Sequence, residues 1–165
     1  FKQKTAYEIP KRDWSSDVCS SDLVDSRQIA AETIAREPFV VALPEGHRFA
    51  RQSALPLSRL AAEPFVIPTP GRSPMHGQII AACSNAGFMP TVAQDAENII
   101  TVIGLVRAGL GVSLLPQSVE TLQPIGIHLR RLRGVDVRVE TAIAWRRDDR
   151  SPVCEAFLAA ARSAA

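Results

Sequence analysis

The side chains best suited to hold a small anion stand in residues 67–73, with the sequence IPTPGRS. Thr69 offers a hydroxyl group, Gly71 lets a ligand approach the backbone closely, and Arg72 can pair with a carboxylate through two parallel hydrogen bonds. Ser73 stands at the expected start of a helix, where backbone N–H groups are free to meet an anion. This stretch therefore predicts a binding loop for a carboxylate.

A second candidate place is residues 94–98, with the sequence QDAEN, at the start of another expected helix. Asn98 could donate a hydrogen bond to a ligand there, whereas Glu97 would repel an anion. Ligands of open α/β sheets bind outside the carboxyl ends of the strands, and both stretches leave an expected strand and enter a helix. The candidate contact residues are Pro68, Thr69, Pro70, Gly71, Arg72, Ser73, Glu97 and Asn98.

Structural roles compete with these binding roles. Ser73 followed by Pro74 also fits a plain helix cap, and Arg72 also fits a solvated surface charge. Glu97 fits equally an acid in the first turn that stabilises the helix dipole. The residue types leave these alternatives open.

The sequence gives little support for a catalytic site or a metal site. Ser73, His76 and Asp95 could compose a nucleophile, base and acid, but no Gly-x-Ser-x-Gly elbow or other supporting motif accompanies them. No two cysteines form a CxxC pair, and none has a histidine at metal-ligand spacing. We therefore expect no catalytic residue, no metal and no cofactor. The three cysteines are Cys19, Cys83 and Cys154.

Composition excludes other classes. The chain has 165 residues, 46% of them apolar, and a formal net charge of +2, which indicates an ordinary globular domain. That charge is too small, and the arginines too scattered, to follow a phosphate backbone, so we expect no nucleic-acid binding by this chain itself. No apolar run approaches the roughly 18 to 20 residues that span a bilayer, and the unpaired cysteines fit the cytoplasm.

The first 23 residues differ from the rest. All three lysines and the only tyrosine lie in the first eleven residues, whereas every basic residue from Val24 onward, apart from histidine, is arginine. The stretch 1–23 lacks apolar periodicity and resembles translated sequencing-adapter sequence, so we expect it to be non-native. The alternative is a natural disordered arm, in which Tyr7 and Trp14 would be docking residues.

Beyond residue 24, short apolar runs alternate with helical patterns, which is typical of a mostly parallel α/β sheet. The helix that ends at Gly109 is rich in Ile, Val and Leu, so we expect it to be largely buried. His47 is expected in a turn. The expected elements are strand 39–43, turn 45–47, helix 56–62, strand 65–67, helix 74–85, strand 91–94, helix 95 or 97 to 109, strand 112–116, helix 117–122, strands 127–132 and 137–145, and a helix from 152 with Val153, Phe157 and Leu158 on one side.

Four blocks together carry a family resemblance. They are EPFVVALPEGHRFA, LSRLAAEPFVIPTPGRS, VRAGLGVSLLP and DDRSPVCEAFLAAAR. In order and spacing they resemble the effector-binding domain of LysR-type transcriptional regulators, over roughly residues 27–164. The most specific block is RAGLGVSLLP, in which Gly109 and Gly111 permit a helix-to-strand turn that side chains would block.

The resemblance implies an α/β fold of the periplasmic-binding-protein-like type 2, with two lobes, two crossover strands and an effector in the cleft between the lobes. Residues 37–128 would form a nearly complete second lobe. Residues 24–36 would be a first-lobe remnant and crossover, and residues 129–165 would return to the first lobe. The first lobe would be partial.

The function implied by the resemblance is effector sensing for a DNA-binding regulator, not catalysis. The ligand would be a small metabolite, with a carboxylate as the expected group, and Pro-Thr-x-Gly at residues 68–71 resembles the pocket loop of muconate sensors. Such regulators form homodimers or homotetramers and bind DNA through an N-terminal helix-turn-helix, which we expect to be absent before Val24. No membrane partner is expected, and the implied location is the cytoplasm.

Two other classes share this architecture. A periplasmic solute-binding protein would need a signal peptide upstream of Val24. An enzyme on the same scaffold would need a convergent acid, base or nucleophile, which the sequence does not offer.

Overall fold

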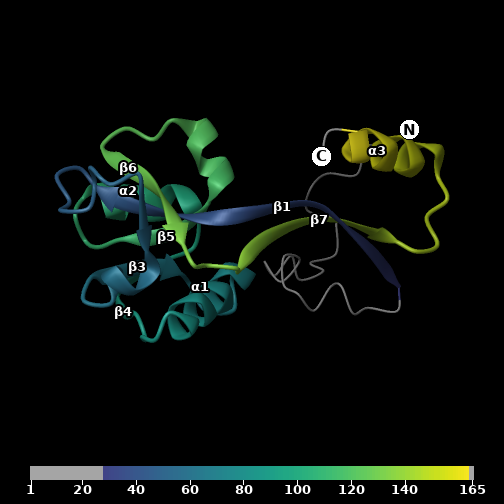
Figure 1. Ribbon diagram of the computed structural model, residues 1–165. Coiled ribbons are helices and arrows are strands. Elements are labelled where there is room, and N and C mark those ends of the chain that lie inside the picture. The colour runs from purple at the N-terminus through teal and green to yellow at the C-terminus, as the bar shows by residue number, and fades with distance from the viewer. Residues whose placement is uncertain (1–27, 164–165) are drawn as a thin grey trace, which may run out of the picture.

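The computed structural model describes residues 28–163 of the chain. The segment 1–23, expected to be non-native, lies outside the described residues. One larger body is joined by a two-stranded ribbon to a C-terminal helix (Figure 1). The elements are β1 (Ile29–Pro44), β2 (Ala54–Pro56), η3 (Leu57–Leu60), β3 (Pro64–Pro68), α1 (Pro74–Asn85), β4 (Thr91–Ala96), α2 (Ile99–Arg107), β5 (Ser113–Pro116), η4 (Gln117–Leu122), β6 (Ile127–Arg133), β7 (Arg138–Arg146) and α3 (Pro152–Ser163). Within residues 28–163, no helix is long and apolar enough to span a bilayer.

The C-terminal half of β1 is the centre of the larger body. Residues 39–43 are each at most 2% exposed, and their side chains alternate between two faces of the sheet. Phe39, Val41 and Leu43 belong to one apolar cluster, and Val40 and Ala42 belong to the other. The predicted buried strand is confirmed. Burying each large apolar side chain here contributes about 1.5–3 kcal/mol.

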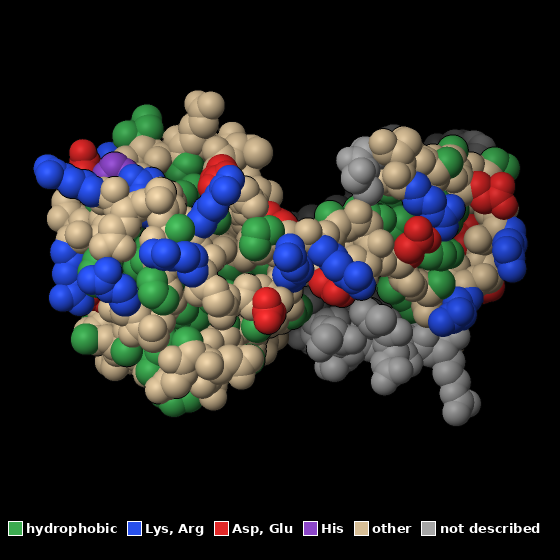
Figure 2. Space-filling model, viewed as in Figure 1, with side chains coloured by type: hydrophobic (Ala, Val, Ile, Leu, Met, Phe, Trp, Pro, Cys, Tyr) green, Lys and Arg blue, Asp and Glu red, His purple; other side chains and the backbone are tan. Residues whose placement is uncertain are grey.

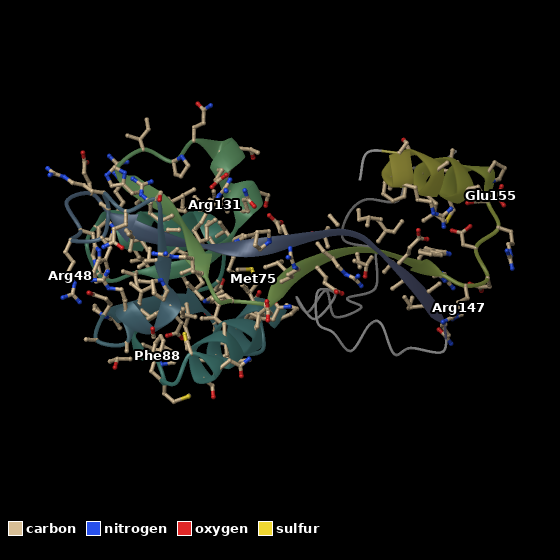
Figure 3. The ribbon with its side chains drawn as sticks, in the orientation of Figure 1. Arg48, Met75, Phe88, Arg131, Arg147 and Glu155 are labelled. Carbon is tan, nitrogen blue, oxygen red and sulfur yellow. The ribbon has the colours of Figure 1, made fainter. Side chains whose placement is uncertain are left out.

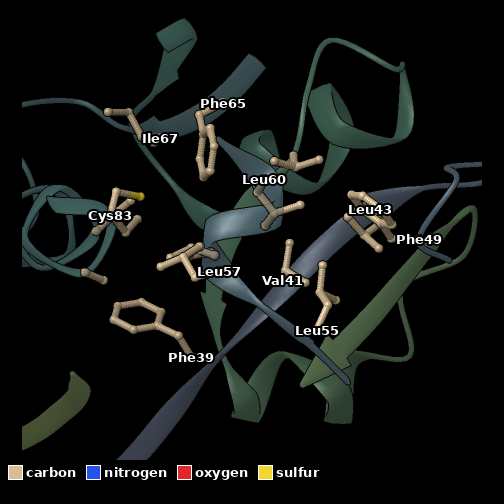
Figure 4. Close-up of a cluster of buried hydrophobic side chains, with 14 of the residues drawn as sticks. Phe39, Val41, Leu43, Phe49, Leu55, Leu57, Leu60, Phe65, Ile67 and Cys83 are labelled. Carbon is tan, nitrogen blue, oxygen red and sulfur yellow. The ribbon is translucent and has the colours of Figure 1, made fainter. Parts of the chain in front are cut away.

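Helices cover both faces of the sheet. The first cluster is closed by α1, which contributes Ile79 and Cys83, and by η3, which contributes Leu57 (Figure 4). The second cluster is closed by α2 through Val102 and Val106. The body therefore has three layers, with the sheet in the middle.

Cys83 is a core residue, as its place on an apolar stripe predicts. Its side chain is fully buried, and burial raises the pKa of the thiol to about 11. The thiol therefore stays protonated near neutral pH and packs as a small apolar group.

The sheet differs from the expected mostly parallel one. Strand β1 is antiparallel to β5, β6 and β7, whereas the parallel pairs are β2 with β6 and β3 with β4. A parallel bridge between Phe65 and Val112 joins β3 to β5. The mostly parallel expectation is therefore wrong for the described residues. Local sequence patterns indicate where the strands lie, but their directions depend on the long strand β1, which pairs with three others.

Strand β1 is also longer than expected, because it begins at Ile29 rather than at residue 39. Residues 29–38 are rich in Ala and Glu and include Pro38, which disfavours a strand on local grounds. Pairing with β7 overrides that preference, with a bulge between Thr33 and Ala35. An ion pair between Arg36 and Glu140, 2.8 Å from Nε to Oε1, lies across the two strands.

Helix α2 begins and packs differently from the expectation. It starts at Ile99 rather than at residue 95 or 97, and Asp95 lies in β4. Within the helix only Val102 and Val106 are buried, and the Ile100 side chain is 66% exposed. The expectation of a largely buried helix is therefore wrong, because one face of α2 looks away from the sheet.

Two other helices are partly as expected. The helix expected at 56–62 is the short 3₁₀-helix η3, and Pro56 before it belongs to β2. In α3, Leu158 is buried, but Val153 and Phe157 are exposed rather than packed on a common apolar face. The sequence did not predict β2, and the remaining strands and helices, including the turn at His47, lie close to their expected positions.

Gly111 stands where two backbones meet, as predicted. A Cβ atom at this position would lie 2.4 Å from the Pro64 carbonyl oxygen. The close approach permits two 2.8 Å hydrogen bonds, from Val112 N to Pro64 O and from Val66 N to Val112 O. Gly109, with φ of +83°, turns the chain out of α2 just before this contact. These bonds hold β3 and β4 to the rest of the sheet.

Replacing Gly111 therefore tests this contact. We expect Gly111→Ala to lower the free energy of unfolding by about 1–3 kcal/mol, because the methyl group must push β3 away from β5. Chemical denaturation gives the value. Gly104→Ala in α2 is the matched control, since no atom lies within 4 Å of its added Cβ, and it should stabilise by about 0.5–1 kcal/mol. Equal effects from both variants would contradict the role given to Gly111.

Helix α3 is tied to the ribbon by an ion pair. Arg162 donates to Glu32 of β1, with Nε 3.0 Å from Oε1 and Nη2 2.6 Å from Oε2. These hydrogen bonds, and secondarily the arginine charge, hold the pKa of Glu32 below its usual value, although partial desolvation opposes them. The pair joins elements 130 positions apart in the sequence.

The lowered pKa of Glu32 predicts a pH dependence. Its stabilising effect is fully present above the ordinary pKa of an unfolded glutamate and disappears as the pH falls through the lower folded pKa. In Arg162→Gln, the Glu32 pKa should rise toward the ordinary value, and this part of the acid dependence of stability should vanish. Carboxyl NMR titration of both proteins measures the change. An unchanged Glu32 titration would show that Arg162 does not hold this carboxylate in solution.

Candidate functional site

Three parallel strands end at one edge of the sheet. Pro68, the last residue of β3, pairs with Ala96, the last residue of β4, and the bridge at Phe65 aligns β5 in the same direction. Strand β5 ends at Pro116, which lies opposite Phe39 of the antiparallel strand β1. The N-terminal half of β1 therefore leaves the body at this carboxyl edge. Met75, at the start of α1, lies on the ribbon side of the body, and Arg48 lies at the opposite end (Figure 3).

The loop after β3 is a tight turn at this edge. Thr69 N donates to Ala96 O at 3.0 Å, and Arg72 N donates to Thr69 O at 3.2 Å. Gly71 has φ of +72°, and no atom lies within 4 Å of the position of a Cβ. Pro68 is buried, whereas Pro70, Gly71 and Arg72 are exposed. The loop thus has a fixed base and an open outer face.

Ser73 caps helix α1. Its Oγ accepts a hydrogen bond from Met75 N at 3.2 Å, and Pro74 occupies the first turn of the helix. The alternative of a helix cap is therefore confirmed for the side chain, which leaves the backbone of residue 73 as its contribution to a binding loop.

His76 fixes the same helix to the sheet, a role that the sequence did not suggest. Its Nδ1 lies 2.8 Å from Pro68 O, so Nδ1 carries the proton and donates to the carbonyl. The ring therefore holds the start of α1 against the end of β3. A histidine three residues after an expected cap, close to a strand end, was the available signal.

Asn98 caps helix α2. Its Oδ1 accepts from Thr101 N at 2.9 Å and from Thr101 Oγ1 at 3.0 Å. Glu97 precedes this cap, so its interpretation as a first-turn acid is wrong. Instead, Glu97 Oε1 lies 3.9 Å from Arg72 Nη2, with 72% and 47% of the two side chains exposed. An ion pair this exposed is worth about 0–1 kcal/mol, so it opens at little cost.

The structure thus brings together the two stretches that the sequence singled out. Residues 69–73 and 97–98 follow neighbouring strands, and the starts of α1 and α2 lie behind them. Arg72 is an exposed charge with a loose ion pair to Glu97, which agrees with its alternative interpretation as a solvated surface charge and leaves its binding role a prediction.

A third strand end was missed in the sequence. Glu37, on β1 where it leaves the body, accepts hydrogen bonds from the backbone N and the Oγ of Ser118 at the start of η4, the latter at 3.0 Å. Ser118 could have been predicted as a candidate residue, because it follows the expected strand 112–116. Glu37 could not be found, since its position depends on the antiparallel register of β1. A carboxylate of another strand occupies the η4 end, whereas α1 and α2 are capped by the neighbouring side chains of Ser73 and Asn98.

Catalytic and metal chemistry have no support in residues 28–163. Ser73 Oγ is bonded to a backbone amide, His76 Nδ1 to a carbonyl, and no hydrogen bond joins either of them to Asp95 within this part of the chain. No group of three or more His, Cys, Asp or Glu side chains in it could hold a metal ion.

Comparison with known proteins identifies the family. The model of the LysR substrate binding domain matches residues 18–165. This chain belongs to the LysR substrate-binding domain family. Relatives include the HTH-type transcriptional regulator AlsR of Bacillus subtilis, 30% identical over 77% of this chain and 42% of its own length. BudR of Raoultella terrigena is 33% identical over 81% of this chain and 46% of its own length. The chain therefore spans less than half the length of these relatives.

Solved structures agree on the fold. CbnR, a LysR family transcriptional regulator, matches with a TM-score of 0.76 and 24% identity over 85% of this chain and 49% of that protein. The BenM effector binding domain, solved with its effector benzoate, matches with a TM-score of 0.72 and 21% identity over 84% of this chain and 64% of that domain. The predicted α/β fold of periplasmic-binding-protein-like type 2 is confirmed. The prediction that the domain is not an enzyme is confirmed by relatives that are named as transcriptional regulators.

The Asn98 cap of α2 predicts that two variants of this residue differ in stability. Asn98→Ala should lower the free energy of unfolding by about 1 kcal/mol, because Thr101 N loses its acceptor. Asn98→Asp keeps an oxygen at the cap and should remain within a few tenths of a kcal/mol of the native value. Thermal or chemical denaturation distinguishes them. Equal loss in both variants would mean that the amide nitrogen, rather than Oδ1, matters for stability.

Proposed function

We propose that the chain is the effector-sensing part of a LysR-type transcriptional regulator and that its carboxyl edge binds a small carboxylate metabolite. The observation that carries the proposal is the pairing of Pro68 with Ala96, which sets the loops before α1 and α2 side by side. Two helix starts then direct the partial positive charge of their dipoles to the same space, although the first amides of α1 are already bonded to Ser73. The third helix start at this edge is already taken by Glu37.

Each candidate residue receives a role in this proposal. Thr69 offers its hydroxyl, Gly71 gives close access to the backbone, and Ser73 contributes its amide because its Oγ serves the cap. Asn98 keeps its amino group for donation, since only its Oδ1 is used by Thr101. The two prolines, Pro68 and Pro70, stiffen the loop between them.

Arg72 is the residue proposed to hold the carboxylate. Its exposed ion pair with Glu97, at 3.9 Å, is loose, and a ligand carboxylate placed for two parallel hydrogen bonds would replace it. Glu97 then excludes anions that cannot displace it, which makes it a selectivity residue. That a solved domain of the same fold holds benzoate, a carboxylate, supports this ligand class.

The wider function follows from the relatives. We infer that the whole protein is a cytoplasmic regulator that forms a homodimer or homotetramer and reaches DNA through a helix-turn-helix outside this chain. Residues 37–128 would be one lobe, with 24–36 and 129–165 belonging to the other. An effector would favour one arrangement of the lobes and shift the population of the assembly on DNA. The solute-binding alternative has less support, because the named relatives are regulators.

Benzoate and benzamide form a matched pair of probes for the carboxyl edge. Benzoate should shift the backbone amide NMR signals of Gly71, Arg72 and Ser73, and neutral benzamide should leave them in place. Arg72→Gln should weaken benzoate binding by about tenfold, which corresponds to one charge-assisted hydrogen-bond pair.

Arg150→Gln is the control for this experiment, since it removes the same charge from the exposed loop before α3. It should leave benzoate affinity unchanged. The proposal fails if benzamide shifts the same signals as strongly, or if benzoate shifts only signals remote from residues 69–73 and 97–98.

A further inference from the structure

A pocket lies at the end of the body opposite to the carboxyl edge. It has a volume of about 680 Å³, which falls in the range of small-molecule sites. Its lining holds three arginines, two histidines and no acidic residue. The lining residues are Gly46, His47, Arg48, Ala50, Arg51, His128 and Arg130.

The pocket is formed by the first part of β6 and by the turn after β1, because β2 pairs with only part of β6. Strand β2 pairs with β6 only at residues 131–133, so the earlier part of β6 carries His128 and Arg130 beyond the reach of β2. These two side chains are two positions apart and lie on the same face of the strand. The turn that follows β1 folds over them and brings Arg51. Figure 2 shows basic side chains at this end of the body, with others along the ribbon and around α3.

Two of the three arginines of the pocket are held in place by the protein. Arg130 donates from Nε to Ala50 O and from Nη1 to Leu129 O, each at 2.7 Å, which fixes its guanidinium in the wall. Arg48 stacks on the Phe49 ring at 4.6 Å from its centroid. Such a fixed guanidinium loses little conformational freedom when it binds a ligand.

The local acids leave part of this positive charge unmatched. Glu63 is shared by His47, at 3.4 Å, and Arg48, at 2.6 Å. The side chains of Arg51 and His128 have no hydrogen bond or ion pair with the rest of residues 28–163. Glu45 is exposed at the start of the turn and does not line the pocket, and Glu120 lies in the adjoining hollow without an ion pair to these groups. Arg51, Arg130 and His128 are thus the groups available to a ligand.

We propose that this pocket binds the phosphate group of a small phosphorylated metabolite. Planar guanidinium groups bind the oxygens of phosphate in pairs, and a dianion matches two arginines better than a monocarboxylate does. Because the pocket and the carboxyl edge lie at opposite ends of the sheet, this ligand does not compete with the carboxylate effector for space.

Glycerol 3-phosphate, a phosphate monoester, is the probe for this pocket. In an NMR titration of the full chain, it should shift the amide signals of Gly46, Arg51 and His128. Arg51→Gln should weaken its binding by about tenfold. Arg150→Gln, which removes the same charge elsewhere, should leave the affinity unchanged.

Three results would overturn the proposal. Glycerol 3-phosphate could fail to shift the pocket signals, or both variants could weaken binding equally, which would indicate general charge attraction. Alternatively, a DNA duplex could bind with sensitivity to Arg51→Gln while glycerol 3-phosphate does not, which would assign the arginines to a nucleic-acid surface. None of these outcomes changes the benzoate experiment at the carboxyl edge, so the two proposals fail separately.

Discussion

Strand β1 is the constraint on which the other elements depend. Its residues 39–43 are buried on both faces, so neither α1 nor α2 has a layer to pack on without them. The same strand pairs with β5 and β6 in the body and with β7 in the ribbon. Because backbone hydrogen bonds inside a protein must be satisfied, those three pairings fix the positions of β5, β6 and β7, and β2 then pairs with β6. Gly111 then attaches β3 and β4 to this frame through its close approach to Pro64.

The position of the carboxyl edge follows from that frame. Strands β3, β4 and β5 run in one direction, and β1 leaves the body where they end. The loops before α1 and α2 therefore face the ribbon that leads to α3, and Glu37 reaches the η4 start from β1 itself. The proposed binding groups come from distant parts of the sequence and meet there because strands end there, while Ser73 and Asn98 also have a local structural role. Ser73 and Asn98 show this double use, since one atom of each side chain caps a helix.

Local sequence patterns predicted most elements and the site loops, and failed where long-range pairing decides. Turn and cap residues such as Gly109 and Ser73 act over a few positions, so the end of α2 and the start of α1 could be predicted from them. Ile29 to Pro38 has an unfavourable strand composition, and only β7 makes it a strand. The exposure of Ile100 likewise depends on which face of α2 packs against the sheet. The contact of Glu37 depends on the register of β1, and the contact of His76 depends on the approach of α1 to β3. Neither contact could be predicted from local patterns alone.

The length of the buried half of β1 also separates two regions of charge. From Glu37 to Pro44 the strand covers seven steps, about 23 Å at 3.3 Å per residue. This is almost three times the distance of about 8 Å over which exposed charges act on one another in physiological salt. Anions bound at Arg72 and at Arg51 would therefore not repel each other measurably. Any influence of one on the other must pass through a change in strand twist or core packing.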